Sequence, residues 1–160
     1  MAVAGTARAR APWLYEGPAR DLILACKLRG VRAAAGPLGD AIAECLGEEA
    51  RVVTWVPGRA ADIRARGFDH AEAIARVVAR CCRAPAVPLL RRVGSAPDQT
   101  RLSRVARLRN LDHVFAAAGS PSEVVLVDDL ITTGATMTAC AEALRGAGAA
   151  SIVAVAACRA

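Results

Sequence analysis

The chain has 160 residues, of which 54% are hydrophobic and 3% aromatic, and its formal net charge at pH 7 is +6. This length predicts about one domain, with a core built mainly from Ala, Val, Leu and Ile. No uninterrupted apolar stretch approaches the ~20 residues that span a membrane, and no charged segment followed by an apolar run marks a signal peptide, so we expect a cytoplasmic protein without a membrane partner.

Two helices are predicted before the first core strand. Residues 1–11 are rich in Ala and Arg, and we expect them to form a disordered tip. A helix is predicted over 17–29, because Pro18 is tolerated in a first helical turn. A second helix is predicted over 38–46 and ends at Gly47.

The rest of the chain alternates between strand and helix patterns. Strands are predicted at 51–57, 87–93, 114–118, 124–127 and 151–157, and helices at 68–80, 102–108 and 137–144. A polar, arginine-rich connection is expected over 58–67. This alternation predicts a largely parallel, doubly wound α/β sheet, whose ligands bind at the carboxyl ends of the strands.

The most informative stretch is 124–136, Val-Val-Leu-Val-Asp-Asp-Leu-Ile-Thr-Thr-Gly-Ala-Thr. Its four apolar residues suit a buried strand, so Asp128 and Asp129 fall at the carboxyl end. The turn 132–136 offers backbone N–H groups and hydroxyls at a helix N-terminus, which suits a phosphate. Because carboxylates repel phosphate, the acids and the turn must hold different parts of one ligand, as in a sugar phosphate. The alternative is an ordinary strand–helix turn with a threonine N-cap and a solvated acid pair.

Two arginines and a histidine follow the first core strand. Arg64 and Arg66 precede Gly67, and guanidinium groups grip phosphate oxygens in pairs. One interpretation is a loop that closes over a diphosphate, and the other is a solvated arginine loop. His70 is interpreted as a polar residue at a helix N-terminus or, alternatively, as a general acid or base.

Basic charge gathers in the middle of the chain. Residues 51–109 contain thirteen arginines against four acidic residues, whereas acids outnumber arginines from Ser120 onward. A polyphosphate ligand or a nucleic acid would suit this field. Arg101, Arg104 and Arg109 either meet such a ligand or solvate a helix face.

The six cysteines form no C-x-x-C pair, and the chain has only two histidines. This pattern gives no support to a zinc site. We expect most of the cysteines to be small buried hydrophobes.

These stretches resemble a known family. The run 124–136 is similar to the phosphoribosyl diphosphate (PRPP) signature of type I phosphoribosyltransferases. Further matching features lie along the chain from about Trp13 to Ala157: an apolar helix ending in Lys27 and Gly30, the Val56-Pro57 strand end, Arg66-Gly-Phe68, and Gln99 followed by Arg109-Asn110 and Phe115. Together they resemble the ComF (ComF/GntX) family of competence-associated, phosphoribosyltransferase-like proteins.

The resemblance implies a type I phosphoribosyltransferase-like α/β fold, a mostly parallel sheet flanked by helices with a small N-terminal hood. Residues 12–160 would then form one domain, with 12–50 as the helical hood and 51–160 as the core. The chain departs from the family's pattern twice. It has no cysteine before Cys26, so zinc binding by the four-cysteine ribbon of many members is not carried over. Asp69-His70 stand where members commonly have Asn-Gln, so no role is carried over to these two side chains.

The resemblance also implies an activity. The protein would bind PRPP with Mg²⁺, held mainly by PRPP oxygens and water, and transfer the phosphoribosyl group to a nitrogen acceptor with release of diphosphate. Asp128 and Asp129 would hold the ribose hydroxyls and stabilise positive charge on the sugar. The remaining ligand contacts would divide between the 5′-phosphate, held by Thr132, Thr133, Gly134, Ala135 and Thr136, and the diphosphate, held by Pro57, Gly58, Arg64 and Arg66. No set of protein metal ligands is assigned.

The alternative function is binding without catalysis. The protein would sense PRPP or a nucleotide and serve DNA uptake, contacting single-stranded DNA or competence proteins. The basic middle favours this alternative, whereas the scarcity of aromatic residues for base stacking argues against direct single-strand binding. Both functions predict PRPP binding, so binding alone cannot separate them. Diphosphate release, which only the enzyme would produce, distinguishes them.

Overall fold

The computed structural model describes residues 3–47, 52–93 and 114–160. The predicted helix at 102–108 and the three arginines at 101, 104 and 109 lie outside these residues. No helix in the described part of the chain is long and apolar enough to cross a membrane.

The centre of the molecule is a parallel five-stranded sheet in the order β1-β7-β6-β3, with β2 also pairing β7. Its strands are β1 (Arg8–Arg10), β2 (Trp13–Leu14), β3 (Val53–Trp55), β6 (Glu123–Ile131) and β7 (Ser151–Arg159). The two long central strands carry apolar runs, as expected of parallel strands that are covered on both faces. The predicted α/β class with a mostly parallel sheet is confirmed.

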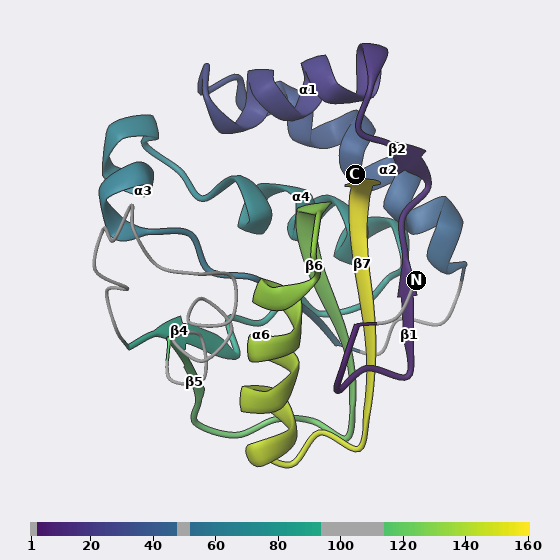
Figure 1. Cartoon of the computed structure of the whole chain (residues 1–160), viewed down its shortest axis with the longest axis vertical. Coiled ribbons are helices and arrows are strands. Elements are labelled where there is room, and N and C mark those ends of the chain that lie inside the picture. Colours follow the sequence, from purple (N-terminus) through teal and green to yellow (C-terminus); the bar gives the residue numbers. More distant parts are fainter. Residues whose placement is uncertain (1–2, 48–51, 94–113) are drawn as a thin grey trace.

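Helices cover both faces of the sheet (Figure 1). One face packs against α1 (Gly17–Lys27), α2 (Ala35–Leu46) and α4 (His70–Cys81), and the other against α6 (Ala135–Gly146). The side chains of β6 alternate between the two cores: Val125 and Val127 belong to the first, Val124 and Leu126 to the second.

The smaller elements lie around the edges of the sheet. In Figure 1, α1 lies across the end of the molecule where β6 and β7 finish. A short helix, η1 (Arg32–Ala34), leads into α2, and α3 (Ala60–Arg66) lies between β3 and α4. The strands β4 (Leu90–Arg92) and β5 (Phe115–Ala117) form a separate antiparallel pair.

Three corrections to the predicted elements bear on the sheet and the site. The expected disordered tip is wrong for Arg8–Arg10, which pair with β7 as β1. The expected connection at 58–67 contains α3, whose capping Gly67 has a φ of +83°. The strand predicted at 124–127 extends to Ile131, because β7 pairs with it along its whole length, up to Ile131 with Arg159. Asp128 and Asp129 therefore belong to the strand itself.

Helices α2 and α4 pack in close contact through Gly39. A Cβ atom placed there would lie 2.5 Å from Cβ of Val77, on the facing helix. The small residue is therefore required by the close packing of α2 against α4.

Candidate functional site

The two acids near the end of β6 face opposite sides of the sheet. Asp129 continues the side-chain row of Val125 and Val127 and is buried beneath α1 and α4. Asp128 lies on the other side, is partly exposed, and lines a hollow with residues 130–137. The alternation of a strand thus gives neighbouring carboxylates different surroundings.

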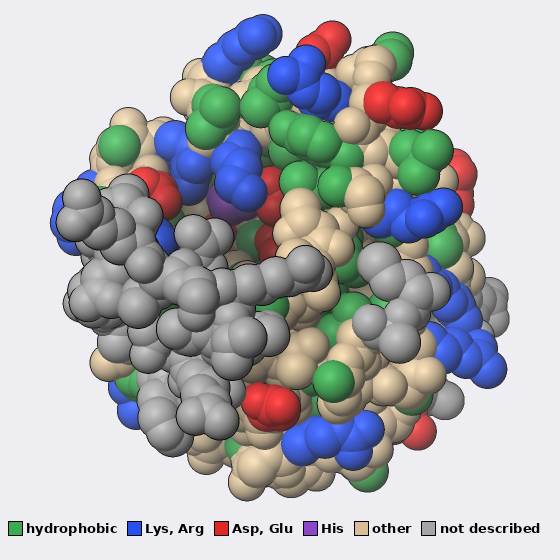
Figure 2. Space-filling view, in the orientation of Figure 1, with side chains coloured by type: hydrophobic (Ala, Val, Ile, Leu, Met, Phe, Trp, Pro, Cys, Tyr) green, Lys and Arg blue, Asp and Glu red, His purple; other side chains and the backbone are tan. Residues whose placement is uncertain are grey.

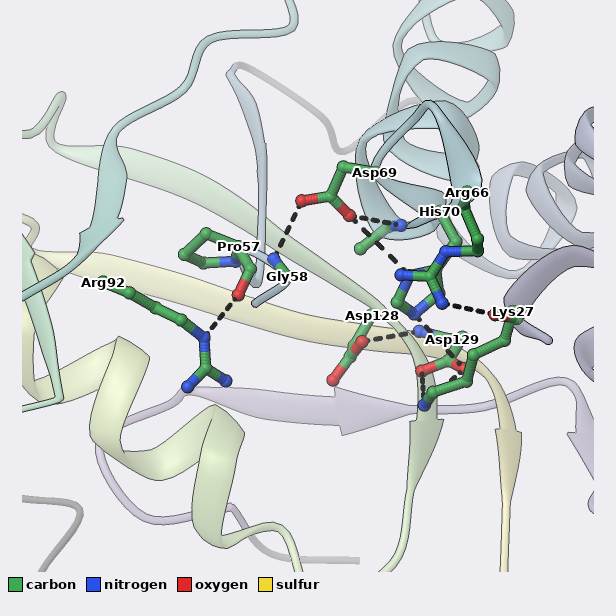
Figure 3. Close-up of polar contacts among 10 residues, drawn as sticks. Lys27, Pro57, Gly58, Arg66, Asp69, His70, Arg92, Asp128 and Asp129 are labelled. Carbon is green, nitrogen blue, oxygen red and sulfur yellow. Dashed lines mark hydrogen bonds and ion pairs between the residues drawn. The ribbon is translucent and has the colours of Figure 1, made fainter. Parts of the chain in front are cut away.

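Asp129 is paired with two basic side chains from distant helices (Figure 3). Its carboxylate accepts hydrogen bonds of 2.9 and 3.3 Å from Nζ of Lys27, on α1. Nε2 of His70, at the start of α4, lies 3.5 Å from Oδ2. Burial alone would raise the pKa of Asp129, but His70 and Lys27 outweigh burial and hold the pKa well below its usual range. Asp129 is therefore ionised at neutral pH.

The pKa of Asp128 is shifted in the opposite direction. Loss of solvent and the adjacent Asp129 carboxylate raise the pKa of Asp128 well above its usual value. Its Oδ1 accepts a hydrogen bond of 2.9 Å from the backbone N–H of Asp129. The site thus combines a stably ionised acid with a neighbour that gains a proton readily.

The turn after β6 brings the N-terminus of α6 into the same hollow. Gly134 caps the helix with a φ of +78°, a left-handed conformation that favours glycine. Thr132 and Thr133 are exposed, and the hollow beside Asp128 is lined by every residue from Leu130 to Met137. The unpaired N–H groups of a helix N-terminus attract anions, so the turn can bind a phosphate.

The loop after β3 is held from both sides. Oδ2 of Asp69 accepts a hydrogen bond of 2.8 Å from the N–H of Gly58, and Oδ1 caps α4 by accepting one of 3.0 Å from Ala71. Nε of Arg92 donates a hydrogen bond of 2.9 Å to the carbonyl of Pro57. These contacts fix the backbone at the strand end that faces the acids.

The two predicted diphosphate arginines have different environments. Arg64 is exposed on α3. Arg66 is partly buried, and its Nη1 donates a hydrogen bond to the carbonyl of Lys27. The structure therefore brings Arg66 to α1 and toward the acid pair, while Arg64 lies on the outer surface.

Sequence reasoning left three residues of the site without a role. Lys27 carried two signals, as the only lysine of the chain and as part of the family resemblance, but its pairing with Asp129 spans 102 positions. Asp69 has the residue type and position of a helix N-cap, a signal that points to α4 but not to Gly58. Arg92, whose guanidinium lies 4.7 Å from the Phe115 ring, had no signal among so many arginines.

The surface around the site combines both charges. Figure 2 shows a depression in which the purple histidine lies beside red acidic side chains, with blue basic side chains along its edge. Among the described residues, the one group that could hold a metal ion is His70, Asp128 and Asp129, whose ligand atoms lie within 4.8 Å of one another. Carboxylate oxygens suit a hard cation such as Mg²⁺.

Comparisons with known proteins agree with this architecture. No curated protein sequence matches the chain. A solved glutamine PRPP amidotransferase from B. subtilis, complexed with ADP and GMP, aligns over 78% of this chain with 26% identity and a TM-score of 0.55. A structure described as the allosteric regulatory enzyme of purine biosynthesis aligns over the same share, with 25% identity and a TM-score of 0.53. The chain spans 26% of the length of each.

The sequence of the second part of the chain decides the family. The phosphoribosyl transferase domain family matches residues 66–160, more than half of the chain. The match begins at Arg66 and includes His70, both acids of β6 and the turn that follows them. The chain belongs to the phosphoribosyl transferase domain family.

Proposed function

We propose that the protein binds PRPP at the carboxyl ends of β3 and β6 and transfers its phosphoribosyl group to a nitrogen acceptor. The observation that carries this proposal is the hollow in which Asp128 lies beside the N-terminal turn of α6. The turn suits the 5′-phosphate and the acids suit the ribose hydroxyls. The likeness to a PRPP amidotransferase supports the same ligand.

Each part of PRPP has a matching group in this proposal. Backbone N–H groups of 132–136 hold the 5′-phosphate at the positive end of the α6 dipole. The backbone at Pro57 and Gly58, kept in place by Asp69 and Arg92, meets the diphosphate. Arg66 approaches from the side of α1, and Arg64 reaches a ligand only if its exposed side chain turns inward.

The transfer breaks the bond between C1 of the ribose and a diphosphate oxygen, and forms a bond between C1 and the acceptor nitrogen. The electron pair leaves with diphosphate, and the proton of the acceptor passes to water. Positive charge grows on the sugar in the transition state, and the ionised Asp129 and its neighbour Asp128 stabilise it electrostatically. Rate acceleration then comes from positioning and charge, without a dedicated general base.

Mg²⁺ fits this site through oxygen donors. The Asp128 carboxylate lines the hollow, and ligand atoms of Asp128 and Asp129 lie within 4.8 Å of each other. A magnesium ion keeps water and substrate oxygens among its ligands. When bound, the ion neutralises part of the diphosphate charge. We propose that PRPP supplies most of its ligands.

The decisive experiment measures diphosphate release. The protein is incubated with PRPP, Mg²⁺ and a panel of nucleobases, ammonia and amines, with Asp128→Asn and Asp129→Asn as comparison variants. Release that requires an acceptor and falls at least tenfold in these variants supports the proposal. PRPP binding without release by any acceptor would leave a binding protein, and absence of PRPP binding would reject the ligand itself.

The role in DNA uptake remains a separate prediction. It rests on the ComF resemblance and on Arg101, Arg104 and Arg109, which lie outside the described residues. Single-strand affinity that is unchanged when these three arginines are replaced by glutamine would refute that basic face.

A further inference from the structure

The second acid of the site is almost sealed from solvent by its two partners. The Asp129 side chain is 3% exposed, whereas the Lys27 side chain that covers it is 41% exposed. A buried carboxylate is tolerated where opposite charges and hydrogen bonds compensate for the lost water. Lys27 provides that compensation through its charge and two hydrogen bonds, and the His70 ring packs 3.5 Å from the carboxylate from a different helix, so the position of the carboxylate depends on both.

Lys27 connects the N-terminal helix to the site. It is the last residue of α1, and its carbonyl accepts a hydrogen bond from Arg66, at the end of α3. The ammonium thus reaches Asp129 from a backbone position that α3 holds in place. The Asp129 carboxylate outweighs burial and raises the pKa of Lys27, so the ammonium stays charged.

His70 connects the two ends of the proposed ligand. Its Nε2 lies 3.5 Å from Asp129 and its Nδ1 lies 3.8 Å from Asp69, whose carboxylate also accepts the N–H of Gly58. The side chain is 9% exposed, and neither ring nitrogen forms a hydrogen bond within the described residues. Contacts this close in a buried site transmit displacements, because neighbouring groups are packed without room to move independently.

We propose that Lys27 and His70 are positioning residues, which hold Asp129 for the ribose hydroxyls and, through His70 and Asp69, couple it to the Gly58 loop. This inference rests on the proposed PRPP site. A continuous row of contacts then runs from α1 to the loop that is proposed to meet the diphosphate (Figure 3). Its members, in order, are Lys27, Asp129, His70, Asp69 and Gly58.

Binding of ligand fragments tests this role without catalysis. Calorimetric titration of ribose 5-phosphate and of inorganic phosphate separates the sugar contacts from the phosphate contacts. We expect Lys27→Gln and His70→Ala to weaken the affinity for ribose 5-phosphate by about tenfold. The affinity for phosphate should stay within about twofold of the wild-type value, because the turn 132–136 is unchanged. His70→Gln, which keeps a polar side chain between Asp129 and Asp69, should restore most of the loss.

Coupling is tested by adding inorganic diphosphate. In the wild type, saturating diphosphate should change the ribose 5-phosphate Kd by about fivefold, and His70→Ala should abolish this change. Arg76→Gln, on the exposed face of α4, is the control variant, and circular dichroism confirms that each variant is folded.

The possible outcomes are distinct. If the wild type binds neither PRPP nor ribose 5-phosphate, the proposed function fails. If the wild type binds both ligands, but the folded His70→Ala variant keeps the wild-type affinity for ribose 5-phosphate relative to phosphate and the wild-type response to diphosphate, the positioning role is overturned. Uptake of Mn²⁺ without PRPP that His70→Gln abolishes would also overturn it, because His70 would then be a metal ligand with Asp128 and Asp129.

Discussion

Replacing Asp128 with asparagine should stabilise the ligand-free protein. The ligand atoms of Asp128 and Asp129 lie within 4.8 Å of each other. Two unit charges at that separation repel by about 3 kcal/mol at an effective dielectric constant of ~20, and by about 1 kcal/mol in a water-like environment. Asparagine keeps the oxygen that accepts the Asp129 N–H and removes the charge. For a chain of this length we expect the Tm to rise by about 2 to 10 °C at pH 8.

The pH dependence gives this prediction its sign. The pKa of Asp128 is raised on folding, so the folded state binds the proton more tightly than the unfolded state does. Its contribution favours folding at low pH and is lost as pH rises through the folded pKa. Thermal unfolding followed by circular dichroism between pH 4 and 8 should therefore show a difference from wild type that grows with pH.

The neighbouring acid provides the matched control. Asp129→Asn should lower the Tm at pH 8, because it leaves Lys27 without the carboxylate that it contacts at 2.9 Å. A Tm of Asp128→Asn that is unchanged or lower at pH 8, or a difference that grows as the pH falls, would refute the assignment of unlike roles to the two acids.

The remaining predictions concern packing and the loop after β3. Gly39→Ala should destabilise the protein by about 1 to 3 kcal/mol in urea unfolding, because its Cβ would lie 2.5 Å from Cβ of Val77. Gly36→Ala, in the same helix with nothing within 4 Å of its added Cβ, should instead stabilise by about 0.5 to 1 kcal/mol, and equal effects of the two would contradict the packing argument. Asp69→Ala should lower the free energy of unfolding by about 2 kcal/mol and weaken PRPP binding, because it removes the cap of α4 and the acceptor for the Gly58 N–H. If Asp69→Asn, which keeps an acceptor oxygen, binds PRPP as weakly as Asp69→Ala does, the acceptor role is contradicted.

The proposed site could be located from sequence where its geometry is local. The apolar run before Asp128, the paired acids and the turn up to Thr136 form one continuous segment. A strand followed by a helix N-terminus places such a segment at the carboxyl edge of a sheet whatever surrounds it. The same locality explains why α2 and α4 were predicted with small boundary errors from their apolar periodicity and from Gly47.

Predictions failed where pairing between distant segments decides the structure. Arg8–Arg10 has no strand pattern of its own and becomes β1 because β7 offers an edge for pairing. The strand β6 extends past its apolar run because β7 pairs with it as far as Ile131. In both cases backbone hydrogen bonds to another segment outweigh the local residue preference.

The α/β class, the acid pair and the turn at a helix N-terminus could be predicted from local sequence, because they follow from periodicities of two and 3.6 residues and from turn chemistry within a few positions. The difference between the two acids arises only from tertiary contacts. The tertiary structure places Asp129 under Lys27 and His70, which come from two helices far away in the chain, and leaves Asp128 in the hollow beside α6. The charge and accessibility of a carboxylate depend on neighbours within a few ångströms, and folding brings those neighbours together.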